Sequence, residues 1–164
     1  MKKSMEALKK LASRNSLRRE LLSVHYSKSF TEATDSFVFG RINISFLVNE
    51  KDENKESLYL NVQEGTIQKN VNYPSLDELI KQFDDSECVK KEFVFAENYE
   101  DLYADLQKNG IKVEPKFLKK VCNFISTLAN DSKSPVSRVF ATEYILLFEV
   151  GNKIGYAGVA LRRE

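Results

Sequence analysis

Residues 144–161 read YILLFEVGNKIGYAGVAL, and this stretch decides the fold. Two apolar runs, Tyr144–Phe148 and Ile154–Leu161, flank the pair Gly151–Asn152. Glycine and asparagine tolerate the positive φ angles that tight hairpin turns require, so the pattern predicts a C-terminal β-hairpin within residues 138–163. The runs are too continuous for a surface that faces solvent. We therefore expect this hairpin to form central or closing strands of a sheet.

Glycines inside the hairpin indicate a packing role. Gly155 and Gly158 lie within the second apolar run, where glycine indicates a bulge or a close backbone approach instead of a nucleotide-binding loop. If this strand lies at an edge of the sheet, Tyr156 and Gly158 mark a place where a partner strand could add.

Composition predicts one globular domain that spans residues 1–164. The chain is 42% apolar and 30% charged, with six glycines and three prolines, which is typical of a folded domain. Its apolar runs are all too short to cross a bilayer, and Met1–Glu6 leads into no apolar signal-peptide core. With only Cys88 and Cys122, no disulfide framework is indicated, although one bridge between them stays open. We expect a soluble cytoplasmic protein.

Charge is concentrated at the N-terminus. The first twenty residues hold seven basic and two acidic side chains, a net charge of +5, whereas the whole chain carries +1. Such a basic segment is either a solvated helix face or a contact for nucleic acid, a membrane surface or an acidic partner. The candidate interaction residues are Lys9, Lys10, Arg14, Arg18 and Arg19.

The N-terminal third predicts a helix and then a loop. Apolar residues at helical spacing indicate a basic helix within residues 1–24, which Asn15–Ser16 can divide into two shorter helices. Residues 27–36 are rich in Ser and Thr and predict a mobile polar connector.

Residues 37–71 predict an antiparallel β-meander. Apolar and polar residues alternate over residues 41–49 and again over 58–63, and a weaker strand follows at 66–71. The charged residues 51–56 separate the first two strands as a solvated turn.

Residues 75–129 predict a helical middle with short strands. Ser75 and Glu78 have the spacing of a capping box, Asn98 is a suitable N-cap, and Pro115 suits the first turn of a third helix. A short strand on each side of the second helix predicts a compact β-α-β unit over residues 92–113. The whole pattern is α+β: a meander and a C-terminal hairpin, with about three to four helices packed on the sheet.

The sequence offers little site chemistry. A lone His25 can serve as an acid or base, but no nucleophile pairs with it in the sequence, so we expect a structural or surface role. Carboxylates near Cys88 raise its pKa, and Cys122 is expected in the core. We expect no cofactor and no zinc site. Residue counts leave an all-carboxylate magnesium or calcium site open, but the acidic residues 50–56 lack the spacing of a calcium loop.

One enzymatic alternative is a metal-dependent nuclease. The stretch Ile111–Lys116 ends in Glu-x-Lys, and two aspartates precede it. Such enzymes place two carboxylates on a metal ion and a lysine near the phosphate. The residues of this alternative are Asp101, Asp105, Glu114 and Lys116.

The aromatic residues allow two interpretations. Tyr59, Tyr99 and Tyr103 could interleave with lysines as a stacking surface for single-stranded nucleic acid. Their apolar spacing favours core positions instead.

These observations favour a protein without catalytic machinery. The leading hypothesis is a non-enzymatic protein-binding module, such as a small regulator, an inhibitor or a toxin-neutralising immunity protein, with a protein partner of unknown identity. The second is nucleic-acid association through the basic N-terminal helix, which would weaken steeply with salt. The third is the carboxylate-dependent enzyme.

Overall fold

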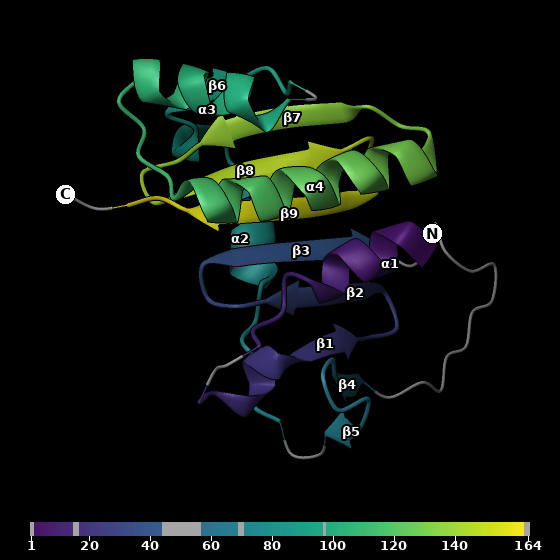
Figure 1. Ribbon diagram of the computed structural model, residues 1–164. Coiled ribbons are helices and arrows are strands. Elements are labelled where there is room, and N and C mark those ends of the chain that lie inside the picture. The colour runs from purple at the N-terminus through teal and green to yellow at the C-terminus, as the bar shows by residue number, and fades with distance from the viewer. Residues whose placement is uncertain (1, 15–16, 44–56, 69–70, 97, 163–164) are drawn as a thin grey trace.

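The computed structural model describes residues 2–14, 17–43, 57–68, 71–96 and 98–162. Within them, nine strands form one antiparallel sheet in the spatial order β5-β4-β1-β2-β3-β9-β8-β7-β6 (Figure 1). The predicted α+β class is confirmed. In chain order the strands are β1 (Ser23–Tyr26), β2 (Phe30–Thr34), β3 (Val38–Asn43), β4 (Leu58–Asn61), β5 (Ile67–Gln68), β6 (Lys91–Phe93), β7 (Val136–Ala141), β8 (Ile145–Val150) and β9 (Gly155–Ala160).

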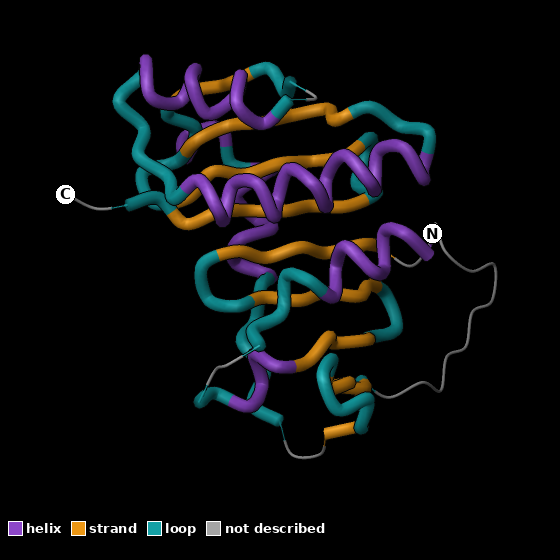
Figure 2. Tube along the Cα trace, viewed as in Figure 1, coloured by secondary structure: helices purple, strands orange, loops and turns teal. Residues whose placement is uncertain are grey.

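Helices cover both faces of the sheet. α1 and α4 lie side by side on one face, α3 packs next to α4, and α2 lies behind the sheet (Figures 1 and 2). No helix of the described residues is long and apolar enough to cross a membrane. The α-helices are α1 (Lys2–Lys9), α2 (Asp77–Lys81), α3 (Tyr99–Lys108) and α4 (Pro115–Ser132), and the 3₁₀ turns are η1 (Arg19–Leu22), η3 (Gln82–Asp84) and η4 (Ser86–Cys88).

The sheet is built from two halves with the same order of elements. α1 precedes β1, β2 and β3, while α4 precedes β7, β8 and β9. β3 and β9 pair antiparallel at the centre, and β4 and β6 add outside β1 and β7. The two helices also run antiparallel, because Ser4 near the start of α1 donates its backbone N–H and its hydroxyl to Asp131 near the end of α4, at 3.0 and 2.6 Å. The halves are therefore related by an approximate twofold axis between β3 and β9.

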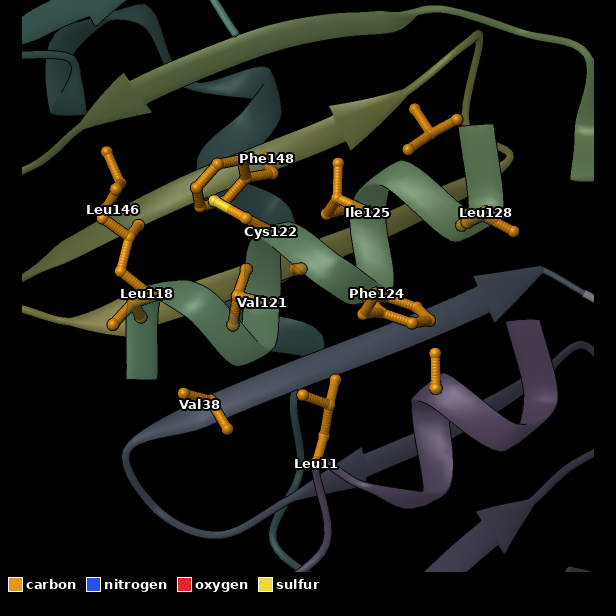
Figure 3. Packing of buried hydrophobic residues seen from close by; sticks show 14 of the residues in the cluster. Leu11, Val38, Leu118, Val121, Cys122, Phe124, Ile125, Leu128, Leu146 and Phe148 are labelled. Carbon is orange, nitrogen blue, oxygen red and sulfur yellow. The ribbon is translucent and has the colours of Figure 1, made fainter. Parts of the chain in front are cut away.

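The main core lies between α4 and the sheet. α4 buries one stripe of side chains against β3, β8 and β9, as the helical spacing predicted (Figure 3). Phe148 and Leu146 of β8 meet this stripe, and Leu11, which follows α1, packs beside it. The buried residues of α4 are Leu118, Val121, Cys122, Phe124, Ile125 and Leu128.

The C-terminal hairpin is confirmed as a central element. β8 and β9 pair over their full length around a turn that contains Gly151 at φ 56°. β9 is not an edge strand, because β3 pairs with its other side. Gly155 lies so close to Leu128 of α4 that a side chain would collide there, and Gly158 lies equally close to Phe39. The expected close approach is therefore the reason for both glycines.

A smaller core lies on the other face, under α2. Phe39, Phe140, Leu147 and Tyr156 from the sheet meet Leu76 and Phe83 from the segment around α2. The predicted capping box of Ser75 is wrong: the residue before the helix is Leu76, which makes no side-chain cap. By contrast, Asn98 caps α3 by accepting from the backbone N–H of Glu100 at 3.0 Å, as predicted.

The predicted long N-terminal helix is much shorter. α1 ends at Lys9, and the chain then turns so that Leu11 becomes fully buried and the N–H of Ser13 donates to the carbonyl of Leu21 at 2.7 Å. Leu17, placed on the apolar stripe by its spacing, is fully exposed instead. Tertiary contacts of Leu11 thus override a helical pattern that continues to residue 24.

Residues 27–36, predicted as a mobile connector, contain strand β2. Four of its five residues are buried, and Glu32 and Thr34 are polar residues whose partners lie within the protein. The prediction was wrong because polar composition was equated with solvent exposure.

The predicted antiparallel meander is confirmed, but its strand order differs from the prediction. β4 pairs with β1 and β5, not with β3, whose neighbours are β2 and β9. The predicted strand over residues 41–49 begins earlier, since β3 spans Val38–Asn43, and the rest of that prediction, with the charged turn at 51–56, lies outside the described residues.

The predicted β-α-β unit is also wrong. β6 and α3 are present, but residues 111–114 form no strand, and β6 pairs antiparallel with β7. Val113 is nevertheless buried. An apolar pattern of three residues therefore reports burial and not strand pairing.

Candidate functional site

A groove opens beside α4 because α1 is too short to accompany it. At about 1.5 Å per residue, the eight residues of α1 span about 12 Å and the eighteen of α4 about 27 Å. α1 starts next to the end of α4, as the Ser4–Asp131 contact shows. Among the described residues, the first turns of α4 therefore have no helical neighbour on that side, and the segment that follows α1 and the β2–β3 turn border the space.

The groove is basic. Its volume is about 640 Å³, within the range of about 300–1,000 Å³ that is typical of binding pockets. Four cationic side chains line it, against one carboxylate. The lining residues are Lys10, Ala12, Ser13, Arg14, Asp35, Phe37, Lys116, Phe117 and Lys120.

Two stacked aromatic rings lie in this basic setting. Phe37 from the β2–β3 turn and Phe117 from α4 stack with their centroids 5.1 Å apart and their planes at 6°. The ammonium of Lys116 lies 5.1 Å from the centroid of Phe117, a cation–π arrangement. Phe37 is still 54% exposed. Aromatic rings are enriched at protein interfaces relative to the rest of the protein surface.

The single carboxylate ties the two walls together. Lys120 of α4 lies 3.3 Å from Oδ2 of Asp35, whose side chain is 11% exposed. The remaining cations, Lys10, Arg14 and Lys116, are exposed. The groove therefore attracts negative charge.

The predicted interaction residues divide between this groove and other surfaces. Lys10 and Arg14 line the groove. Lys9 instead lies 3.4 Å from Glu6 on α1, and Arg18 lies 2.8 Å from Glu20. The side chain of the fifth candidate, Arg19, lies outside the described residues.

Other groove residues were missed in the sequence. The helical spacing allowed either Phe117 or Leu118 to face the core, and the structure buries Leu118. Lys120 carried no signal of its own. Asp35–Ser36 before Phe37 is a turn signal, and it could have indicated that the following aromatic residue is exposed. Lys116, predicted for the nuclease alternative, also lines this groove.

The carboxylates of the nuclease alternative lie elsewhere. Asp101 and Asp105 are exposed on α3, and Glu114 precedes α4 and pairs with Arg162. Among the residues that the structure describes, no three His, Cys, Asp or Glu side chains lie close enough to hold a metal ion. The acidic residues 50–56 lie outside the described residues.

A second charged feature crosses the opposite face of the sheet. Its members are directly paired across five neighbouring strand pairs, so their side chains form one row. In order from β1 to β7, the row is His25, Glu32, Arg41, Tyr156, Glu149 and Arg138.

Most of the charge in this row is paired within the protein. Oε1 of Glu32 lies 3.0 Å from Nδ1 of His25, and Oε2 accepts from Nε of Arg41 at 2.9 Å. Arg41 also donates to Asp77 of α2 at 2.9 Å and lies 3.7 Å from the ring centroid of Phe30. The network therefore fastens α2 to the sheet.

Aromatic rings surround His25. Tyr59 stacks on it at 4.6 Å, and Tyr73 lies 5.1 Å away. Nε2 of His25 and the hydroxyl of Tyr73 are buried and make no hydrogen bond of normal geometry to a described residue. Burial, and next the Glu32 carboxylate, raise the pKa of Tyr73, while the nearby backbone N–H of Thr34 opposes this. The expected structural role of His25 agrees with this setting.

Neither cysteine belongs to the groove or to the charged row, and the pKa of each thiol is raised. A hydrogen bond to Asp85, 3.1 Å from the sulfur, raises the pKa of Cys88, and burial raises the pKa of Cys122 to about 12. Both are free thiols.

Comparisons with protein-family models, with curated proteins and with solved structures gave no match. We therefore infer a function from the chemistry of the groove.

Proposed function

We propose that the protein is a non-enzymatic protein-binding module that holds an acidic segment of a partner in the basic groove. The observation that supports this is the combination of four cations with a stacked aromatic pair, of which Phe37 is exposed, in one concave site. Aromatic residues and arginine are enriched in protein interfaces, and Phe37, Phe117 and Arg14 all line this groove. A small regulator, inhibitor or immunity protein would act in this way.

Nucleic acid is the second candidate, because Lys10 and Arg14 belong to the basic N-terminal segment. Two features favour protein. Phe37 and Phe117 cover each other on their facing sides, so no base can insert between the two rings as they are stacked. The cations gather at one short groove, whereas nucleic-acid binding needs a path along the backbone.

Charge reversal in the groove tests the proposal. We would measure binding of an acidic peptide and of a polyuridylate oligonucleotide to the full chain and to the Lys116→Glu and Arg14→Glu variants. Lys91→Glu is the control, because Lys91 is exposed on β6 and does not line the groove. We expect each groove variant, but not the control, to weaken peptide binding about tenfold or more.

Two outcomes would overturn the proposal. Peptide binding that is equal in both groove variants and in the control would remove the groove as the site. Tighter binding of the oligonucleotide than of the peptide, lost in the same variants, would favour the nucleic-acid alternative.

A further inference from the structure

We infer that the β2–β3 turn is the specificity element of this groove: it presents Phe37 as a rigid platform for one apolar side chain of an acidic partner segment. This inference rests on the proposed function and adds the chemistry of the partner. The segment would carry an aromatic or long aliphatic residue with carboxylates on both sides of it.

Hydrogen bonds fix the backbone of the turn on both sides of Phe37. Oδ1 of Asp35 accepts from the backbone N–H of Phe37 at 2.8 Å and of Val38 at 2.9 Å. The N–H of Asp35 donates to the carbonyl of Val38, which also accepts from the hydroxyl of Thr34 at 2.7 Å. The carbonyl of Phe37 accepts from the N–H of Ala160 in β9 at 2.8 Å. A platform fixed in this way loses little conformational entropy on binding.

The backbone at the turn is also strained. Ser36 has φ 81°, in the region that favours glycine. Non-glycine residues in such conformations cluster at binding sites and switch regions, because the surrounding structure must hold them there. Here the residue immediately before the exposed ring carries the strain, which supports a functional role for that ring.

The exposed part of the Phe37 ring favours contact with an apolar side chain. One face of Phe37 is covered by Phe117, yet 54% of the residue remains exposed. Covering the rest with a carboxylate would dehydrate that group without pairing it, whereas an apolar side chain gains by leaving water.

The cations then define the neighbours of the apolar side chain. Lys116 lies on the α4 wall of the groove, and Lys10 and Arg14 lie in the segment that follows α1. A side chain seated on Phe37 therefore lies in a groove that takes its cations from two segments of the chain, so its neighbours in the partner chain would be acidic. An acidic segment that lacks a central apolar residue would contact the cations but leave Phe37 exposed.

Paired peptides and variants test this inference. We would titrate the full chain with an acidic peptide that has a central phenylalanine and with the same peptide carrying alanine there, following amide NMR spectra. The variants are Phe37→Ala and Phe37→Leu, and Tyr144→Ala is the matched control, because Tyr144 is an aromatic residue of similar exposure, 55%, in another turn. Thermal unfolding would confirm that each variant is folded.

The expected result is a preference of about tenfold or more for the phenylalanine peptide. Phe37→Ala should abolish this preference, Phe37→Leu should keep part of it, and Tyr144→Ala should leave it unchanged. Equal binding of the two peptides would overturn the inference while leaving the proposed function intact. Peptide binding that is unchanged in the Lys116→Glu variant would overturn both the inference and the proposed function.

Discussion

Replacing Glu32 with glutamine removes the carboxylate that joins His25 to Arg41. Its side chain is 2% exposed, and that of Arg41 is 7% exposed. The substitution keeps the shape of the side chain and one carbonyl acceptor, so it tests the charge of Glu32 with little change in packing.

The expected loss of stability follows from the charge that remains. Removing one partner of a buried ion pair costs about 3–5 kcal/mol, because the other charge stays buried. Arg41 keeps its contact with Asp77, whose side chain is 61% exposed. We therefore expect the lower end of the range, about 3 kcal/mol.

Urea unfolding at neutral pH measures this loss. With an m-value of about 2 kcal/mol per molar urea, the midpoint should fall by about 1.5 M. The control is Glu92→Gln, because Glu92 lies 3.7 Å from Arg138 but is 69% exposed. A surface pair of this kind contributes about 1 kcal/mol or less.

A second variant separates charge from packing. Replacing Glu32 with glutamine and Arg41 with methionine removes both charges, so the double variant should recover at least about 1 kcal/mol relative to Glu32→Gln. A loss for Glu32→Gln no larger than that for Glu92→Gln would refute the reasoning, since the buried carboxylate would then behave like an exposed one.

Three further predictions concern packing, a thiol and a phenol. Gly40→Ala should lower stability by about 1–3 kcal/mol in thermal unfolding, because the new Cβ would lie 2.5 Å from Cδ1 of Leu11; a neutral result would contradict the packing. Asp85→Asn should speed alkylation of Cys88 at mildly alkaline pH, because the hydrogen bond to Asp85 raises the pKa of that thiol; an unchanged rate would contradict this cause. Burial, and next Glu149, raise the pKa of Tyr156 from 10.0 to about 12. Its contribution to stability is therefore fully present below pH 10 and is lost as the pH rises towards 12. In the Tyr156→Phe variant, the free energy of unfolding should fall less steeply between pH 10 and 12. The same pH dependence in the variant and the original protein would show that other groups cause the loss.

Local patterns predicted the elements whose signals lie within a few neighbouring residues. The C-terminal hairpin needed only Gly151–Asn152 and its flanking apolar runs. α4 needed its stripe and Pro115, and α3 needed Asn98 as its cap and Gly110 after its end, which has φ 73°. In each case the residues that determine the element are adjacent in the chain.

β2 could not be predicted because its burial depends on residues distant in the sequence. Glu32 is buried because Arg41 pairs with one of its oxygens and His25 lies 3.0 Å from the other across the sheet. The same holds for the pairing of β4 with β1, since nothing within residues 58–63 distinguishes β1 from β3 as a neighbour. Apolar periodicity reports which face is buried and carries no information on which strand lies beside it.

The sequence predicted the basic part of the groove but not its aromatic pair. The basic segment that holds Lys10 and Arg14 was recognised from its charge, because an excess of cations over twenty residues is a local property. The aromatic pair was not recognised, since Phe37 and Phe117 are eighty residues apart in the sequence and meet through the packing of α4 on the sheet. The lengths of two helices, rather than any motif, create the site.

The two charged features of the fold differ in what a partner could gain from them. In the row, Arg41 already bonds two carboxylates and is almost fully buried, so an incoming anion would have to displace Asp77 and gain little. In the groove, Lys10 and Lys116 are exposed, and an anion there adds contacts without breaking a buried pair. The strained turn before Phe37 lies at this same groove. The buried charges thus stabilise the fold, and we propose that the partner binds where the charges face solvent.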